Sequence, residues 1–386
     1  MISRIAEKLI RSHARQFRAL AVIGPRQSGK TTLVRTVFPN KPYISLENPD
    51  ERLFATSDPR AFLRRFTHGA ILDEAQRVPE LFSYLQQILD ETKKTGLFIL
   101  TGSNNFLLQE SITQSLAGRI GFIDLLPLSA TEINSITSIE HTSGDIILKG
   151  CYPELYDKKI RAGVWYPSYI RTYVERDVKL LRNIDNTLLF NRFLQLCAGR
   201  IGQQLSVSAL SNECGIDVKT VNAWLGVLQS SYIIHLVQPH HRNFNKRVVK
   251  TPKLYFIDTG LACSLLGIRE TRELENSHFK GALFENLVVM ELQKNILNHG
   301  SASRLYFWRD NKGVEIDVLI DTGKKLIPVE IKSAQTVQES QLKSLLQWSK
   351  FSGITGGYLF YDGQMELTTS TRVKVSNWRK AGELKL

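Results

Sequence analysis

The 386-residue sequence predicts an α/β protein that begins with a parallel sheet and ends with a separate αβββαβ domain. Three observations predict this fold. A glycine-rich loop near the N-terminus lies between an apolar run and a helical segment, and an apolar run that ends in Asp-Glu follows about 40 residues later. Beyond residue 300, three short strand-like runs succeed one another. The segments between these features read as helices and a short β-rich segment.

The glycine-rich loop spans residues 24–31 and reads Gly-Pro-Arg-Gln-Ser-Gly-Lys-Thr. Glycines let backbone amides approach phosphate closely, and the following helix N-terminus adds partial positive charge. We expect Lys30 to reach the β- and γ-phosphates of ATP and the Thr31 hydroxyl to hold Mg²⁺. The residues expected to contact the nucleotide here are Gly24, Pro25, Arg26, Gln27, Ser28, Gly29, Lys30, Thr31 and Thr32.

The second apolar run, residues 69–72, ends in Asp73 and Glu74. A Mg²⁺ ion on Thr31 needs a carboxylate beside it, which Asp73 would supply, and Glu74 would orient the attacking water. A third strand at 97–100 is followed by small polar residues, which belong at the crevice where ligands bind in open α/β sheets. From that group, Ser103 is expected to sense the γ-phosphate, with Asn104 as the alternative.

Composition limits the partners. Lys and Arg number 50 against 37 Asp and Glu, a formal net charge of +13. This surplus favours a polyanionic partner, nucleic acid before an acidic membrane, over a merely solvated surface. The four cysteines lack C-x-x-C spacing and predict neither a zinc site nor a disulfide framework. Without a signal-type apolar core or a stretch of about 18 apolar residues, we expect a cytoplasmic protein that makes no membrane contact.

The middle of the chain reads as helices. Residues 131–185 lose the parallel α/β pattern, and we expect them to form a helical lid or connector. Tyr166, Tyr169 and Tyr173 recur there at helical spacing, a pattern that favours core packing over base stacking.

Residues 207–228 have the shape of a helix-turn-helix within a winged-helix domain. Leu210 is expected to pack, Gly215 to end the first helix and Asp217 to cap the second. The second helix has an apolar face and a face available to a DNA groove. The apolar face comprises Val221, Trp224, Leu225 and Leu228, and the other face Lys219, Thr220, Asn222 and Ala223.

A basic segment without acids follows between Leu236 and Ile257, about where the wing of a winged helix falls. Phosphate contact would be its natural use, although winged helices also bind proteins. The basic residues are Arg242, Lys246, Arg247, Lys250 and Lys253.

The last third of the chain holds a second cluster of chemistry-bearing residues. Strands are expected at 304–308, 315–320 and 326–331, followed by a helix and a strand at 357–361. Glu330 and Lys332 are two residues apart and share a strand face, and Asp317 lies across the hairpin from them. Such carboxylates with a lysine can hold a divalent metal and steady an attacking hydroxide. Glu285, on the preceding helix, is a further candidate metal ligand.

The motifs, taken in order, resemble known families. GPRQSGKTT, ILDEAQ, LTGS, LAGR, LPLS, YPE, KTPKLYFIDTGL and VEIK are similar to a bacterial and archaeal family of AAA-superfamily ATPases with a C-terminal domain of unassigned function. The resemblance implies a P-loop NTPase (AAA-type) core, in which Arg119 would enter the site of a neighbouring subunit, unless it serves in a structural salt bridge. The acid and E-x-K spacing is similar to the PD-(D/E)XK nuclease superfamily, a restriction-endonuclease-like fold that also occurs in inactive domains.

These observations predict four domains: an ATPase core at 1–130, the helical lid or connector at 131–185, the winged helix at 186–260 and the nuclease-like domain at 261–386. The leading hypothesis is a Mg²⁺-dependent ATPase that binds DNA, branched DNA included, and remodels or moves it. One alternative is an ATP-gated metal-dependent nuclease, and another is a nucleotide-dependent switch that binds a protein partner. If Arg119 acts on a neighbour, the protein is a homo-oligomer, for which a ring is the usual solution.

Overall fold

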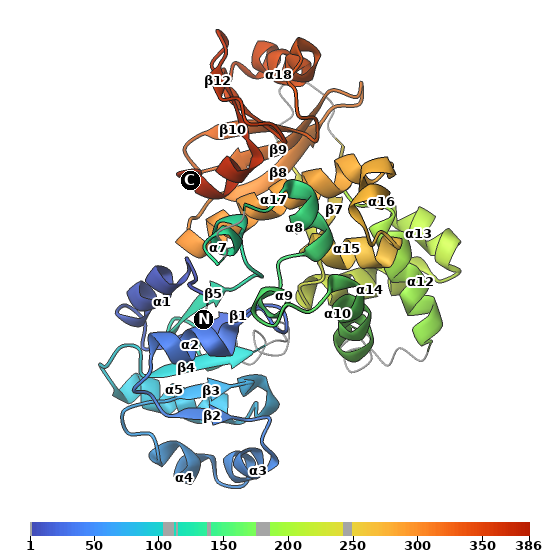
Figure 1. Ribbon diagram of the computed structural model, residues 1–386. Helices are drawn as coiled ribbons and strands as arrows, with labels where there is room; N and C mark the ends of the chain where they lie inside the picture. Colours follow the sequence, from blue (N-terminus) through green and yellow to red (C-terminus); the bar gives the residue numbers. More distant parts are fainter. Residues whose placement is uncertain (1, 103–111, 113–114, 137–139, 175–185, 242–248) are drawn as a thin grey trace. The chain divides into compact units, whose positions relative to one another are not determined.

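A computed structural model describes the chain except for residues 1, 103–111, 113–114, 137–139, 175–185 and 242–248 (Figure 1). The described residues form two compact units. The first comprises 1–127 with the short segments 230–232 and 297–300, and the second comprises 128–229, 233–296 and 301–386. Each unit contains its own sheet.

The sheet of the first unit has five strands in the order β2-β3-β4-β1-β5, and every pairing is parallel. Alternate residues of β1 belong to two separate cores, Ala21 to one face and Val22 to the other. Helices α4 and α5 supply apolar side chains to the first core, and α1 and α2 supply them to the second. A parallel sheet covered on both faces accounts for the fully buried run 19–23.

These elements have the following bounds: α1 Glu7–Ala14, β1 Ala19–Ile23, α2 Lys30–Val37, β2 Tyr43–Ser45, α3 Pro49–Ser57, α4 Pro59–Arg64, β3 Ile71–Asp73, α5 Leu81–Glu91, β4 Phe98–Gly102 and β5 Ile120–Asp124. The predicted strands at 19–23, 69–73 and 97–100 are therefore confirmed to within two residues at each end. The predicted parallel α/β fold class is confirmed as well.

The second unit is built on an eight-stranded mixed sheet, ordered β12-β13-β11-β10-β9-β8-β6-β7. The strands are β6 Ile234–Pro239, β7 Lys253–Phe256, β8 Arg304–Arg309, β9 Glu315–Asp321, β10 Leu326–Lys332, β11 Gly357–Tyr361, β12 Leu367–Thr368 and β13 Val373–Asn377. Helix α17 (Lys280–His299) precedes β8, and α18 (Lys343–Ser352) connects the parallel strands β10 and β11. The order α17, β8, β9, β10, α18, β11 is the predicted αβββαβ arrangement.

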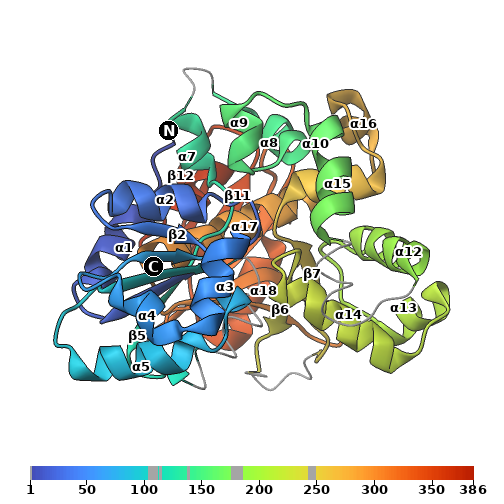
Figure 2. The same ribbon diagram turned by 90° about the horizontal axis from the view of Figure 1, so that it is seen from below.

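The predicted helix-turn-helix is present in the second unit. Helices α12 (Thr187–Ala198), α13 (Val207–Cys214) and α14 (Val218–Ser230) group together (Figure 2). Gly215 ends α13 in the left-handed conformation (φ 71°), and Asp217 accepts the Thr220 backbone N–H at 2.9 Å. The expected apolar face of α14 is buried.

The hairpin after α14 does not stand apart from the C-terminal strands. Strand β6 pairs antiparallel with β7 and also parallel with β8, where Gln238 lies opposite Tyr306. The boundary predicted at residue 260 therefore falls after strands that already belong to the large sheet. The four predicted domain ranges stay a prediction.

Helices α7 (Ala130–Asn134), α8 (Ser143–Lys149), α9 (Pro153–Asp157) and α10 (Ala162–Tyr169) precede a short π-helix, Ile170–Val174. The aromatic stripe packs as expected: Tyr166 and Tyr169 are buried, and the Tyr169 ring stacks on Trp165 at 4.8 Å between centroids. Helices α15 (Thr259–Leu266) and α16 (Thr271–Asn276) complete the second unit. Among the described residues, no helix has the length and apolar content needed to cross a bilayer.

Candidate functional site

The glycine-rich loop connects β1 to α2 with two glycines in unusual backbone conformations. Gly29 caps α2 at φ 90°, in the left-handed region that disfavours side chains. Gly24 has φ 149°, and a Cβ there would lie 2.2 Å from the carbonyl oxygen of Leu125. The two positions therefore require glycine for local reasons, and the result is a loop whose backbone can approach a ligand.

Lys30 lies inside this loop and is 6% exposed. Its ammonium donates to the carbonyl oxygens of Gly24 at 3.0 Å and Pro25 at 2.7 Å. Burial lowers the pKa of Lys30 to about 8, although Glu74 and Asp73 oppose the shift. Because neutral carbonyls hold an ammonium less strongly than anionic oxygens, these bonds are exchangeable for bonds to phosphate.

Asp73 ends β3 and accepts hydrogen bonds from hydroxyl groups on neighbouring elements. Thr31 Oγ1 donates to Oδ1 at 3.0 Å, and Tyr43 OH donates to Oδ2 at 2.7 Å. Thr101, on β4, donates to Oδ1 as well. Strand β4 lies between β1 and β3, so Thr101 is placed between the loop and the acid.

Sequence reasoning did not assign Tyr43 or Thr101 to the site. Thr101 had a signal, because it stands at the end of a strand expected to reach the crevice. Tyr43 had no such signal in the sequence, because its place beside Asp73 depends on the parallel pairing of β2 with β3. Burial and the bond to Asp73 raise the pKa of Tyr43 to about 12.

The residues of this site fit a Mg²⁺-nucleotide. A hydroxyl and a carboxylate separated by 3.0 Å, Thr31 and Asp73, are hard oxygen ligands of the kind Mg²⁺ prefers. Ser28 is fully buried, and within the described chain its Oγ has no hydrogen-bond partner. A buried hydroxyl in that condition favours a ligand that supplies the missing bond.

Glu74 follows Asp73 with φ 54°, a conformation that costs energy for a residue with a side chain. Its Oε2 accepts from Gln76 Nε2 at 2.5 Å. A strained backbone at a residue beside a candidate metal ligand is a feature that clusters at functional sites. This role for Glu74 stays a prediction, and Ser103, the expected γ-phosphate sensor, lies outside the described residues.

Arg119 and the glycine-rich loop lie at opposite ends of the parallel strands. Arg119 precedes β5, whose first residue pairs with Ala19 at the start of β1, whereas the loop follows the end of β1. Its guanidinium pairs with both carboxylate oxygens of Asp90, at 2.5 and 2.9 Å. Arg119 therefore forms a salt bridge within its own unit, and its insertion into a neighbouring subunit stays a prediction.

The second cluster lies in the eight-stranded sheet, where Asp317 on β9 and Glu330 and Lys332 on β10 come together as expected. Lys332 Nζ donates to Glu330 Oε1 at 2.7 Å and to Asp317 Oδ2 at 3.4 Å. Asp317 Oδ2 also accepts the backbone N–H of Ile331 at 2.8 Å. The cluster is thus neutralised in part by its own lysine.

Glu330 is the least satisfied member of the cluster. It is 4% exposed, and its Oε2 has no hydrogen-bond partner among the described residues. Burial and the neighbouring Asp317 raise the pKa of Glu330 to about 8, against the opposing effect of Lys332. Asp317 and Glu330 therefore fit a cation held by two carboxylates, and within the described residues no group of three or more His, Cys, Asp or Glu side chains is arranged around a metal position.

Glu285 is held by residues of β7 that sequence reasoning placed elsewhere. Lys253 Nζ donates to Glu285 at 3.0 Å and pairs with Glu315 at 2.5 Å, and Tyr255 OH donates to Glu285 at 2.6 Å. Because Lys253 is buried, its assignment to a DNA-contacting surface is wrong; it serves the acidic cluster instead. No pattern in the local sequence predicts that β7 lies beside α17.

The remaining basic residues of that segment are mostly outside the described chain. Arg242, Lys246 and Arg247 fall in the undescribed segment 242–248, and Lys250 is exposed. On α14, Lys219 and Asn222 are exposed as expected, whereas Thr220 and Ala223 are half-buried.

Three successive parts of the chain match known families, and two of those families are domains of unknown function. Residues 16–134 match a family described as AAA domain. Residues 141–272 match a Domain of unknown function (DUF8612), and residues 280–380 match another (DUF4143). Neither description assigns nuclease activity, so the nuclease likeness stays a prediction.

Two curated relatives and two solved structures are similar to the chain. Uncharacterized proteins of Mycobacterium tuberculosis and Mycobacterium bovis are each 29% identical over 317 residues, which cover 81% of this chain and 70% of theirs. A Walker-type ATPase of Pyrococcus abyssi is 14% identical, with a TM-score of 0.43, over 67% of this chain and 94% of its own. A signal transduction ATPase with a tetratricopeptide repeat sensor from Pyrococcus horikoshii is 14% identical, with a TM-score of 0.25, over 77% and 47%.

Proposed function

We propose, from the premise that residues 16–134 form an AAA-type ATPase domain, that the protein is a Mg²⁺-dependent ATPase that binds and remodels DNA. The observation that carries the ATPase part is the Lys30 ammonium, held on loop carbonyls beside the Thr31 and Asp73 pair. Bound Mg²⁺ would neutralise charge on the β- and γ-phosphates. The chain's own contribution is to position those phosphates on Lys30 and a water on Glu74.

The DNA part has support from charge and fold. The chain carries 13 more basic than acidic residues, and α13 and α14 form a helix-turn-helix with Lys219 and Asn222 exposed on the second helix. An electrostatic contribution of this kind makes affinity fall steeply with salt.

The test is the ATP hydrolysis rate with and without single-stranded, linear duplex and four-way DNA, with cleavage followed in the same samples. We expect DNA to raise turnover, and we expect Lys30→Ala to remove turnover while sparing DNA binding. Turnover that ignores every DNA tested would contradict the DNA part and leave the ATPase part standing.

The acidic cluster supports a second candidate, an ATP-gated nuclease. Asp317, Glu330 and Lys332 meet within hydrogen-bonding distance, and Glu330 keeps one unsatisfied carboxylate oxygen. This candidate predicts cleavage in Mg²⁺ or Mn²⁺ that is lost in Asp317→Ala. An absence of cleavage on linear and four-way substrates with either metal would exclude it.

The helix-turn-helix supports a third candidate, a nucleotide-dependent switch that binds a protein. From Val207 to Ser230 the sequence contains a single basic residue, Lys219, against the acids Glu213 and Asp217. A DNA-reading helix pair normally carries more positive charge. Slow hydrolysis, nucleotide retained through purification and no salt-sensitive DNA affinity would favour this candidate over the first.

A further inference from the structure

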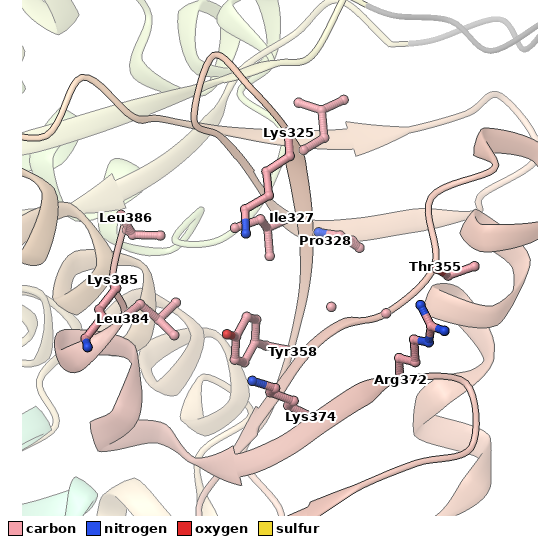
Figure 3. A pocket seen from close by; sticks show the side chains of 13 residues that line it. Lys325, Ile327, Pro328, Thr355, Tyr358, Arg372, Lys374, Leu384, Lys385 and Leu386 are labelled. Atoms are coloured by element: carbon pink, nitrogen blue, oxygen red, sulfur yellow. The ribbon is translucent and has the colours of Figure 1, made fainter.

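A hollow that belongs to neither of the two candidate sites lies at one end of the eight-stranded sheet (Figure 3). It has a volume of about 270 Å³. Its lining comes from the start of β10, the start of β11, the region of β13 and the last residues of the chain. None of these residues belongs to the nucleotide site or to the acidic cluster.

The hollow gathers positive charge without matching acids. Lys325, Arg372, Lys374 and Lys385 line it and are exposed, and no Asp or Glu is among the lining residues. Within the described chain, none of the four cations forms a salt bridge.

Other cations of the same unit behave differently. The ammonium of Lys253 lies 3.0 Å from Glu285, and that of Lys332 lies 2.7 Å from Glu330. The ammonium of Lys294 lies 2.9 Å from Glu291. Cations that line one hollow without such partners repel one another, so an anion placed among them relieves that repulsion.

One wall of the hollow is aromatic and apolar. The Lys374 ammonium lies 5.8 Å from the centre of the Tyr358 ring, and Figure 3 shows Lys325 extending toward the same ring from the other strand. Ile327 and Pro328 contribute apolar surface beside it. A flat ring can pack on such a wall while its charged substituents meet the cations.

The floor of the hollow is backbone. Gly356 and Gly357 have φ of 81° and 129°, and a Cβ on Gly357 would lie 2.4 Å from the carbonyl oxygen of Pro328. The close approach of β11 to β10 therefore requires a residue without a side chain at Gly357. Backbone, rather than a side chain, therefore lines the hollow at this point.

The aromatic side of the hollow and Glu330 lie on opposite faces of the sheet. Tyr358 pairs with Val329 on β10 and with Lys374 on β13, so these three side chains share a face. Glu330 follows Val329 and points to the other face. A ring packed on Tyr358 is therefore separated from the Glu330 carboxylate by the sheet.

We propose that this hollow binds a small phosphate-bearing ligand with a flat ring, the chemistry of a nucleoside phosphate. Phosphate groups suit it because several ammonium groups and the forked guanidinium of Arg372 can share their oxygens. The ring packs on Tyr358, beside the apolar wall. The inference is independent of the proposed function, because it involves no residue of the ATPase unit or the acidic cluster.

The test measures binding of fluorescently labelled ADP to the full-length chain by polarisation, in a Lys30→Ala background that weakens the nucleotide loop. Adding Lys374→Glu or Lys325→Glu is expected to weaken binding about tenfold, the loss of one charge-assisted contact. The matched control is Lys350→Glu, an equal charge reversal at an exposed position on α18 away from the hollow. Equal affinity in the Lys374→Glu and Lys350→Glu chains overturns the proposal.

Competition experiments with other ligands distinguish a nucleoside phosphate from a simple phosphate and from a nucleic acid. Inorganic pyrophosphate should compete more weakly than unlabelled ADP, and Tyr358→Leu should weaken ADP without weakening pyrophosphate. If a single-stranded oligonucleotide displaces the label at lower phosphate concentration than ADP does, the hollow belongs to a nucleic-acid track and the small-ligand assignment is wrong. Unfolding midpoints of the variants should match that of the Lys30→Ala background, because the side chains changed on that background are exposed or half-buried.

Discussion

Each of the two units places a lysine near carboxylates, and the two lysines are held in opposite ways. Lys30 donates to the carbonyls of Gly24 and Pro25, and burial lowers its pKa to about 8. Lys332 donates to the carboxylates of Glu330 and Asp317, and these raise its pKa above its usual range in spite of burial. Among the described residues the first ammonium donates to neutral carbonyls, whereas the second already donates to two carboxylates.

This difference explains what each site is prepared to receive. An ammonium on neutral carbonyls gains strongly from an arriving phosphate, because an anionic acceptor replaces a neutral one. An ammonium already shared by two carboxylates gains little from another anion, and the cluster gains from a cation only if that cation competes with the lysine. The nucleotide unit is therefore prepared for an anion, and the acidic cluster is neutralised internally.

The largest expected effect comes from removing Lys30. In Lys30→Ala, ATP turnover should fall by about 100-fold or more, because a cation that stabilises charge on the transferring phosphoryl group is lost. The measurement is steady-state phosphate release, with Lys8→Ala, an exposed lysine of α1, as the control. If turnover stays within about twofold of that of the unaltered chain, Lys30 does not have the phosphate-binding role that distinguishes it from Lys332.

The same substitution in the other unit should act on stability instead. Lys332→Ala leaves Asp317 and Glu330 without their shared cation, and we expect a loss of about 1–3 kcal/mol in unfolding free energy with ATP turnover unchanged. Urea unfolding can be followed through Trp308 and Trp348, which lie in the core beside this sheet.

Adding Glu330→Gln to Lys332→Ala should restore part of that stability, because it removes one of the unneutralised carboxylates. Glu330→Gln alone serves as the reference for this double-substitution cycle. If Lys332→Ala is neutral and the double variant gains nothing, the cluster is not held by its internal charge balance.

Nucleotide affinity should depend on pH through Lys30. With a pKa of about 8 in the free protein, Lys30 is charged below that pH and progressively neutral above it. A bound phosphate favours the charged form, so affinity for ADP should fall as pH rises from 8 to 10, approaching about tenfold per pH unit. Calorimetry at pH 9 in buffers of different ionisation enthalpy should report proton uptake on binding, and Lys30→Arg should flatten the pH profile because arginine stays charged.

The smallest expected effects concern the tyrosines that bond to each set of carboxylates. Tyr43→Phe removes a hydrogen bond to Asp73 and should lower ATP turnover by about two- to fivefold. Tyr255→Phe removes the corresponding bond to Glu285 and should leave turnover unchanged. Equal effects of the two substitutions on turnover would show that the difference between the sites does not extend to their tyrosines.

Much of both sites was predictable because their residues occur in local patterns. Each local pattern predicts a backbone conformation or a strand face from a few neighbouring residues. The patterns are the glycines around Lys30, the acid that ends β3 and the E-x-K on β10. The hairpin between Asp317 and Glu330 is short, so pairing of β9 with β10 follows from the sequence alone. These are the parts of the sites that local geometry fixes.

The partners that come from distant strands were not predictable. Tyr43 reaches Asp73 across 30 residues, and Lys253 reaches Glu285 across 32. Lys253 looked like part of a basic surface because its neighbours in sequence are basic, yet the pairing of β6 with β8 brings its strand into the large sheet and buries it. Strand order, which no periodicity encodes, decides such contacts.

The sequence by itself determined the nucleotide loop, the acid that ends β3 and the one after it, the helix-turn-helix and the αβββαβ order, because each depends on spacing along one element or one turn. The tertiary structure alone decided that Asp90 holds Arg119, that Lys253 pairs with Glu285 and that Lys325 and Lys374 line one hollow. The physical reason is that charge acts through space. A residue's electrostatic partner is set by the packing of strands and helices, and residues far apart in the chain become neighbours only once those elements are packed.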